Sequence, residues 1–278
     1  MYFNLDKDYL MKLYNTRIQR LKDYIMSNNL KSAVIGLSGG IDSALTSYML
    51  KDAIGSENIY PVMLPSYEST EESQSDAKKV IEKLGIPEEN VKIVEIGEIT
   101  KLILNQCQFD ENNIEPMIKG NISARVRMII LYAYANKLSY NGKRAFVEGT
   151  ENESEYRTGY FTKYGDSGTD FEAMKGLYKT QVRAISRLIE VPEEIINKKP
   201  SAELVKDQTD EDELGITYED IDNILFVLFE EKNTMRLSEF PKDKIMKLIG
   251  IIEKSSHKRN DTEEAHILNE AKQILKAT

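Results

Sequence analysis

An apolar run that ends in two glycines constrains the fold of this chain more than any other segment. Residues 33–37 have the composition of a buried strand, and a helical pattern starts at about Ala44, soon after Gly39 and Gly40. A glycine turn between a strand and a helix presents unpaired backbone N–H groups at the positive end of the helix dipole, which suits a phosphate. The sequence therefore predicts a phosphate-binding loop between this strand and this helix.

Asp42 indicates what else the loop binds. A carboxylate beside a phosphate repels it unless a cation lies between them, and proteins hold Mg²⁺ through carboxylate and phosphate oxygens. We therefore expect a nucleotide with Mg²⁺, with Asp42 as a metal ligand and the hydroxyl groups of Ser38 and Ser43 as added donors. Ile41 stands where the common P-loop needs a lysine, so this is a different loop. The alternative is a plain glycine turn in which Asp42 caps the helix.

The composition excludes several classes of protein. The 278 residues carry a formal net charge of −9, which argues against a general nucleic-acid binder. The single cysteine, Cys107, cannot form an internal disulfide, so a reducing compartment is favoured. The first residues do not resemble a signal peptide, and no apolar run approaches the roughly 18 residues of a membrane span. We expect a cytoplasmic protein that binds neither nucleic acid nor a membrane.

Strand-like and helix-like segments alternate along the first half of the chain. This alternation predicts an α/β fold, a doubly wound parallel sheet of about five strands that binds its ligand at the carboxyl ends of the strands. We expect one domain over residues 1–278, with a core at about 8–200 and a C-terminal helical segment at about 200–278. The predicted strands are 33–37, 59–64, 91–96 and 145–148, and the predicted helices include 8–28 and 120–140.

A polar segment at 149–170 follows the fourth predicted strand and contains several aromatic residues. A loop of this length is usually functional or disordered, and aromatic residues are uncommon in disordered segments. Its first carboxylates could complete a Mg²⁺ site, but we interpret Glu151 and Glu153 as acids that the dipole of a helix favours. Three lysines follow, which could neutralise a leaving pyrophosphate or simply be solvated: Lys163, Lys175 and Lys179.

Two further groups of basic residues stand out. Arg125 and Arg127 lie two positions apart on the long predicted helix, so we expect only one of them to face a ligand. Residues 257–259 (His-Lys-Arg) could bind a phosphate, or could be the cations that a helix C-terminus favours. The two histidines have no cysteine nearby, so no zinc site is expected.

Six motifs follow one another along the chain: Ser38–Ser43, Lys119–Met128, Gly159–Asp166, Lys199–Leu204, Asp212–Ile216 and His257–Arg259. In this order they resemble the motifs of the short, ammonia-dependent NAD synthetases, and the resemblance extends from about residue 8 to about residue 260. The first motif is shared with other ATP pyrophosphatases. The third, Gly-Tyr-Phe-Thr-Lys-Tyr-Gly-Asp, is far more particular.

The resemblance implies an adenine nucleotide alpha-hydrolase-like fold and a reaction in two steps. The nicotinate carboxylate of deamido-NAD (nicotinic acid adenine dinucleotide) attacks the α-phosphate of Mg–ATP, giving an adenylate and pyrophosphate. Ammonia then attacks the activated carboxyl group and releases NAD and AMP, the last step of NAD biosynthesis. The expected nitrogen source is free ammonia or ammonia from a separate protein, and the expected assembly is a homodimer whose interface helps to form the dinucleotide site.

The resemblance also implies roles for individual residues. Asp42, Lys179 and Ser38 are the expected catalytic residues, and Asp42 and Glu155 are the expected Mg²⁺ ligands. The expected ATP-binding residues are Gly36, Leu37, Ser38, Gly39, Gly40, Ile41, Asp42, Ser43, Thr150, Lys179 and Ser201. The residues expected to bind deamido-NAD are Arg125, Lys163, Asp170, His257 and Lys258.

Four places depart from the pattern of that family. Ser201 keeps the hydroxyl of a frequent threonine, and Ser167 replaces a frequent glycine. Met63 stands where bacterial relatives often have arginine, which leaves an ATP contact from that strand end open. Glu151 and Asn152 differ from the usual residues after Gly-Thr, which leaves the local metal geometry open.

Other functions remain as alternatives. One alternative is an enzyme that thiolates tRNA, but such enzymes need paired cysteines and a basic face, whereas this chain has one cysteine and a net negative charge. Another is an enzyme that aminates a nucleotide base, but that function would leave the motifs at 159–166 and 257–259 without an explanation. A non-catalytic nucleotide sensor would not need both Asp42 and Glu155. The predicted helix at 120–140 is either the dimer interface or ordinary core.

Overall fold

The computed structural model describes residues 4–110, 113–200, 209–259 and 262–277. These residues contain one parallel sheet of four strands, in the order β3-β2-β1-β4. Its strands are β1 (Ser32–Gly36), β2 (Ile59–Met63), β3 (Lys92–Ile93) and β4 (Ala145–Glu148). The expected α/β fold with a parallel sheet is therefore confirmed.

The sheet is smaller than expected at both edges. β3 covers only part of the predicted strand 91–96. After Ile93 the pairing continues through single hydrogen bonds, from the Val94 N–H to the Met63 carbonyl and from the Ile96 N–H to the Pro65 carbonyl. The described residues form four strands instead of about five. At the β4 edge, a fifth strand is reduced to one bridge between Glu148 and Phe171. The Ala173 N–H, two residues after Phe171, donates to the Glu148 side chain instead of to a strand, so the chain leaves the sheet after the bridge.

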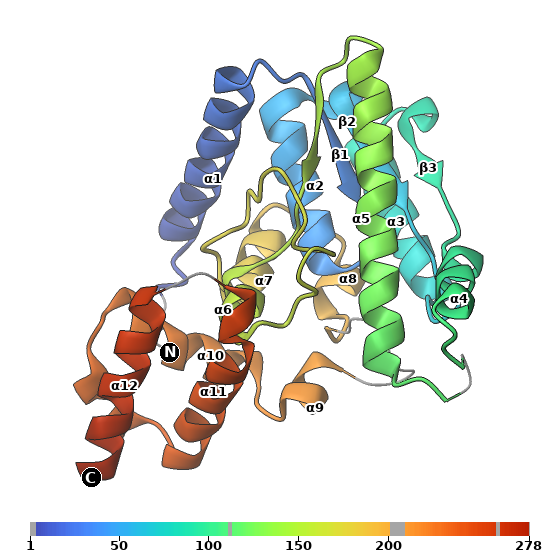
Figure 1. Ribbon diagram of the computed structural model, residues 1–278. Coiled ribbons are helices and arrows are strands. Elements are labelled where there is room, and N and C mark those ends of the chain that lie inside the picture. The colour runs from blue at the N-terminus through green and yellow to red at the C-terminus, as the bar shows by residue number, and fades with distance from the viewer. Residues whose placement is uncertain (1–3, 111–112, 201–208, 260–261, 278) are drawn as a thin grey trace.

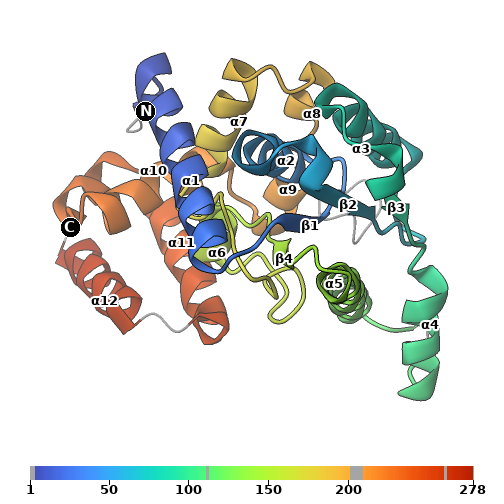
Figure 2. The ribbon, with the colours of Figure 1, turned by 90° about the horizontal axis from the view of Figure 1, so that it is seen from above.

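Helices cover both faces of the sheet, as Figures 1 and 2 show. The alternation of side chains along β1 explains why, because Ala33 and Ile35 belong to the core on one face while Val34 belongs to the core on the other. The first face packs against α1 (Lys7–Ser27), α2 (Ile41–Ile54), α3 (Glu71–Leu84) and α7 (Lys179–Leu188). The second face packs against α5 (Pro116–Tyr140), beside which lies α4 (Gly97–Gln106).

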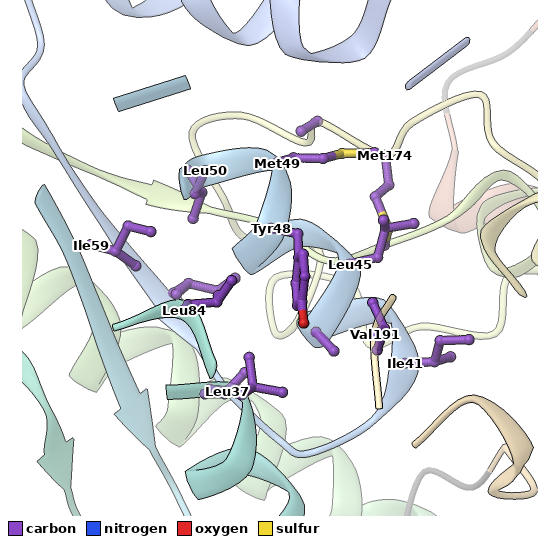
Figure 3. Packing of buried hydrophobic residues seen from close by; sticks show 14 of the residues in the cluster. Leu37, Ile41, Leu45, Tyr48, Met49, Leu50, Ile59, Leu84, Met174 and Val191 are labelled. Carbon is purple, nitrogen blue, oxygen red and sulfur yellow. The ribbon is translucent and has the colours of Figure 1, made fainter. Parts of the chain in front are cut away.

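Helix α2 lies between the sheet and the outer helices, so it buries side chains on all sides. Figure 3 shows Met49 of α2 beside Met174, with Leu84 of α3 and Val191 in the same cluster. Burial of this kind holds the helix rigidly against the sheet. Asp42 in its first turn is therefore fixed relative to the glycine loop that precedes it.

Helices α10 (Tyr218–Leu225), α11 (Lys242–Ser255) and α12 (Thr262–Ala277) have a hydrophobic core of their own, which includes Ile221, Leu248 and Leu268. In Figure 1 these three helices lie together at one end of the molecule, beside α6 (Glu153–Thr158). No described helix is long and apolar enough to cross a membrane. The remaining elements are α8 (Glu193–Asn197), α9 (Asp210–Leu214), and the short helices η1 (Ser56–Asn58), η2 (Glu88–Asn90), η3 (Phe226–Glu230), η4 (Thr234–Glu239) and η5 (Ser256–Lys258).

Candidate active site

The glycine loop between β1 and α2 is held in one conformation by its own side chains. The Ser38 and Ser43 hydroxyl oxygens lie 3.1 Å apart, and the Ser43 hydroxyl also donates to the Gly40 carbonyl at 3.0 Å. Gly39 has φ +86°, and a Cβ there would lie 2.1 Å from the Ser73 carbonyl oxygen, so only glycine fits. The loop is therefore preorganised, with its N–H groups at the start of α2.

A buried ammonium group joins the two expected metal ligands. Lys179 Nζ lies 2.5 Å from Asp42 Oδ2 and 2.9 Å from Glu155 Oε1. The Lys179 side chain is 2% exposed, and the two carboxylates are partly exposed. Burial by itself lowers the pKa of Lys179, but the charges of Asp42 and Glu155 outweigh it and leave this pKa above its ordinary value. Lys179 is thus a permanent positive charge between two carboxylates.

Asn152 organises this cluster, although we did not predict a role for it. Its amide Nδ2 donates to Asp42 Oδ1 at 2.9 Å, and its Oδ1 accepts from the Glu155 N–H at 3.0 Å. Glu155 Oε2 accepts in return from the Asn152 N–H, which completes a capping box at the start of α6. The capping-box pattern Asn-x-x-Glu was the available signal. Asn152 therefore sets the positions of both carboxylates at once.

Lys179 is placed by the backbone as well as by its ion pairs. Its N–H donates to the Ser154 hydroxyl at 2.8 Å, and that hydroxyl donates to the buried Asp222 carboxylate of α10. The other Asp222 oxygen accepts from the Thr180 N–H at 2.8 Å, at the start of α7. The first turns of α6 and α7 are therefore joined beside the candidate site through one carboxylate of the C-terminal helices.

A cavity of about 570 Å³ opens at the carboxyl ends of the strands, in front of this cluster. Of the residues expected to bind ATP, all described ones except Gly39 line it, and Ser201 lies outside the described residues. Met63, at the position where bacterial relatives often have an arginine, also lines the cavity. The lining comes from the glycine loop, the ends of β2 and β4, α5 and the segment after α6, and includes Gly36, Leu37, Ser38, Gly40, Ile41, Asp42, Ser43, Thr150, Glu155 and Lys179.

Four of the five residues expected to bind the dinucleotide lie in one chain of contacts. The exposed Arg125 side chain donates to the Lys163 carbonyl, and Lys163 Nζ donates to the His257 carbonyl at 3.1 Å. Lys258 Nζ donates to the Gly159 and Phe161 carbonyls at 2.7 Å. Of these four residues only Lys258 lines the cavity.

The fifth residue, Asp170, lies outside that chain of contacts. Its Oδ2 accepts from the Val147 N–H at 2.8 Å and its Oδ1 accepts from the Tyr132 hydroxyl at 2.9 Å. Both carboxylate oxygens are therefore engaged within the fold. Asp170 is exposed but does not line the cavity.

The cavity also presents polar residues to which we had assigned no role. Arg127 lines it and donates to the Leu64 carbonyl at 3.2 Å, whereas Arg125 points elsewhere. Asp166 lines it too, and accepts from the Thr162 N–H at 2.8 Å. The signals were present, since Arg127 is the other arginine of the long helix and Asp166 ends the most particular motif.

Three side chains near α6 differ from simple solvated groups. Glu153 accepts from Arg157 Nε at 2.7 Å. Glu151 is buried with no hydrogen-bond partner for its Oε1, and burial raises its pKa to about 10. Lys175 lies over the ring of Tyr156, 4.5 Å from its centre. Glu153 lies in the first turn of α6, as its interpretation as an acid favoured by the helix dipole requires, whereas Glu151 precedes the N-cap residue Asn152 and is buried.

Comparison with known proteins agrees with this geometry. A sequence model of the NAD synthase family matches residues 13–262. The chain belongs to this family. The NH(3)-dependent NAD(+) synthetase of Thermococcus sibiricus is 40% identical over 252 residues, which cover 89% of this chain and 94% of that protein.

Two solved structures extend the comparison to the fold of this NAD synthase family member. The NMN synthetase of Francisella tularensis has a TM-score of 0.78 and 32% identity, and the match covers 91% of this chain and 97% of that one. The NH3-dependent NAD synthetase of Campylobacter jejuni has a TM-score of 0.73 and 28% identity, with coverage of 90% and 95%. Both share the layered α/β architecture described above.

Proposed function

We propose that this protein amidates deamido-NAD with ammonia at the expense of ATP, forming NAD, AMP and pyrophosphate through an adenylate. The observation that carries this proposal is the Lys179 ammonium between Asp42 and Glu155, beside a glycine loop at the edge of the cavity. Fixed positive charge at this place suits a reaction in which pyrophosphate leaves. The names of the relatives support ammonia as the nitrogen donor.

The donor set at this place fits Mg²⁺, which prefers one or two carboxylates together with phosphate oxygens and water. Asp42 and Glu155 supply two carboxylates that already share one cation, the ammonium group of Lys179. No group of three or more candidate ligands occurs in the described part of the chain, so substrate phosphates would have to complete the coordination. Bound there, the ion would neutralise charge on the phosphates of ATP.

The chain's own residues position the reactants and supply charge. The loop N–H groups and the Ser38 hydroxyl bind phosphate oxygens, and Lys179 stabilises the charge that develops on the leaving pyrophosphate. The nicotinate carboxylate is the nucleophile toward the α-phosphate, and ammonia is the nucleophile toward the adenylate. No protein nucleophile is required, so catalysis rests on orientation and electrostatics.

We place the dinucleotide along the contacts that join Arg125, Lys163, His257 and Lys258. Lys258 lines the cavity and the other three residues do not, so we place the end of a long ligand that leaves the cavity across them. In support of this placement, three of the four residues are arginine or lysine, and a dinucleotide carries phosphates. Substitution of Lys163 by alanine should raise the KM of deamido-NAD more than that of ATP, and an unchanged KM for deamido-NAD would remove Lys163 from this role.

The expected homodimer is part of the proposal. On α5, Val126 is buried in the core, whereas Ile129 is 59% exposed. Met117 and Ile118 at the start of α5 and Leu102 of α4 are exposed as well. The helix therefore serves as core on one side and offers an apolar face on the other, which suits an interface. Sedimentation at micromolar concentration tests this, and a monomer would exclude it. A cytoplasmic location also stays a prediction.

A second candidate substrate is a mononucleotide. The solved structure with the TM-score of 0.78 is of an NMN synthetase, and three of the four residues in that chain of contacts do not line the cavity. Nicotinate mononucleotide carries the same reacting carboxylate and lacks the adenosine half. Both substrates would use Asp42, Glu155 and Lys179 in the same way, so the difference lies only in the acceptor.

The experiment that tests the proposal is chromatographic analysis of products with ATP, Mg²⁺, an ammonium salt and either deamido-NAD or nicotinate mononucleotide. Parallel samples omit one component or replace ammonium with glutamine. Equal amounts of NAD and AMP, dependent on ammonium and on deamido-NAD, would confirm the proposed reaction. Preferential amidation of the mononucleotide would favour the second candidate. AMP without either product would show that the acceptor is wrong.

A further inference from the structure

Arg259 is a buried arginine whose five N–H donors all have acceptors. Its side chain is 0% exposed. Nε and Nη2 donate to the two Glu264 oxygens of α12 at 3.0 and 2.9 Å. Nη2 also donates to the Ile252 carbonyl, and Nη1 donates to the Ser255 hydroxyl and to the Tyr156 carbonyl of α6. One guanidinium group therefore joins α6, α11 and α12.

Those contacts end beside groups already placed at the cavity. Tyr156 follows Glu155 directly, so the hydrogen bond from Arg259 holds the turn of α6 that carries a proposed metal ligand. Lys258 precedes Arg259 and reaches the cavity, where it holds the Gly159 and Phe161 carbonyls.

The approach of Gly159 to this region shows how little room there is. A Cβ on Gly159 would lie 2.2 Å from Ser255 Cβ and 3.0 Å from Arg259 Nη1. Gly159 opens the segment Gly159–Asp166, whose residues Tyr160, Phe161, Thr162, Gly165 and Asp166 line the cavity. A small shift of residues 255–259 would therefore move Lys258 and press on this segment at Gly159.

An apolar contact could hold three helices together without burying charge. Glu264 is 3% exposed and faces a second cation, since Arg157 Nη1 lies 3.8 Å from its Oε2. Burial of charged groups opposes folding unless every donor and acceptor has a partner. A network in which all of them have partners fixes the orientation of the groups that it joins. Arg259 satisfies that condition, and its fork geometry fixes direction in a way that lysine cannot.

We propose that Arg259, held by Glu264, is a positioning residue for the substrate side of the cavity: it fixes Lys258 and the segment 159–166 against the turn of α6 that carries Glu155. Because the cavity binds substrate only under the proposed function, the kinetic part of this inference rests on that function. The structural part, control of the segment 159–166 from the C-terminal helices, does not.

The test compares Arg259→Lys and Glu264→Gln with Arg236→Lys. Arg236 is a matched control, since it lies in the same C-terminal helices and also pairs with two carboxylates, Glu231 and Glu239, but on the surface. Three kinds of measurement are made on each full-length variant, and they give three sets of quantities: the kinetic constants KM and kcat for each substrate, the melting temperature, and hydrogen–deuterium exchange of residues 159–166.

We expect Arg259→Lys to raise the KM of deamido-NAD about tenfold or more, because misplacement of a positioning group by about 1 Å can change rates by up to about a hundredfold. The KM of ATP should stay within about twofold, because Glu155 keeps its own contacts with Asn152 and Lys179. Exchange in residues 159–166 should become faster. Glu264→Gln should show the same effects in smaller measure, and it serves alone if Arg259→Lys does not fold. Arg236→Lys should change none of the three quantities.

A lower melting temperature with unchanged KM and unchanged exchange at 159–166 in both variants would show a merely structural role and would overturn the inference. An equal rise in KM for both substrates would overturn it too, since it assigns Arg259 to one side of the cavity. If the wild-type protein makes no NAD but the variants still speed exchange at 159–166, the proposed function fails and the positioning role is supported.

Discussion

Lys179 and Asp42 form an ion pair, Nζ to Oδ2, at 2.5 Å, although 137 positions separate them in the chain. The same ammonium group binds Glu155 at 2.9 Å. A buried lysine of this kind needs opposite charge, since an isolated buried ammonium would lose its proton. The two carboxylates in turn remain close to each other because Lys179 lies between them. The three side chains therefore act as one unit.

Lys179→Met should lower kcat by on the order of 10² to 10³ because it removes fixed positive charge from the leaving pyrophosphate. It also leaves Asp42 and Glu155 without their shared cation, so the melting temperature should fall. Lys179→Arg, which keeps the charge, should retain more activity than Lys179→Met. The measurement is kcat at saturating ATP, with circular dichroism to show that each variant is folded. A kcat for Lys179→Met equal to that of the wild type would remove Lys179 from catalysis.

Asp42→Asn should reduce turnover by about a hundredfold or more and leave the fold intact. The new amide can still accept the hydrogen bond from Asn152, but it can no longer pair with Lys179 or bind a cation through a charged oxygen. The Mg²⁺ concentration for half-maximal activity should rise. Asp52→Asn is the matched control, since Asp52 lies at the other, exposed end of α2 and accepts from the Tyr14 hydroxyl. Equal effects of the two substitutions would contradict the metal role of Asp42.

Gly159→Ala should destabilise the protein far more than Gly85→Ala. Both glycines follow a helix in the left-handed conformation, with φ +68° and +64°, so both substitutions carry a similar backbone strain of about 1 kcal/mol. At Gly85 an added Cβ meets nothing within 4 Å, whereas at Gly159 it would lie 2.2 Å from Ser255 Cβ. The overpacking should add about 1–3 kcal/mol to the loss. Urea unfolding measures both, and equal losses would show that α6 and α11 separate easily.

Asp222 should make stability depend on pH. Burial raises its pKa to about 6, although hydrogen bonds from Ser154 and Thr180 oppose this, and an unfolded chain has the ordinary value near 4. A raised pKa means that the folded state binds the proton more tightly, so this contribution to stability is complete below about pH 4 and is lost as pH rises to about 6. The two-unit difference corresponds to about 3 kcal/mol.

Asp222→Asn should remove that contribution. The free energy of unfolding of the variant, relative to the wild type, should therefore increase by up to about 3 kcal/mol between pH 4 and pH 7. Asp220→Asn on the same helix is the control with opposite sign, because burial there is outweighed by the hydrogen bond from Lys244 and the pKa of Asp220 is lowered. A difference between Asp222→Asn and the wild type that does not change with pH would contradict the prediction.

The parts of the site that could be predicted from sequence are those in which a local conformation demands particular residues. The glycine loop requires Gly39 because a Cβ there would strike the Ser73 carbonyl, and the alternating pattern of β1 follows from its two buried faces. The capping role of Asn152 could have been predicted too, since a capping box is local, but its hydrogen bond to Asp42 joins residues 110 positions apart.

The sequence by itself determined the order of strands and helices and the position of the glycine loop, because side-chain periodicity and turn conformation depend on neighbouring residues. It did not determine that Arg127 and not Arg125 lines the cavity, that Glu151 is buried, or that Asp222 and Arg259 hold α6 from the C-terminal helices. Those relationships depend on how segments that are far apart in the sequence pack together. Only the tertiary structure sets which side chains a packed layer excludes from water and which it leaves beside the ligand.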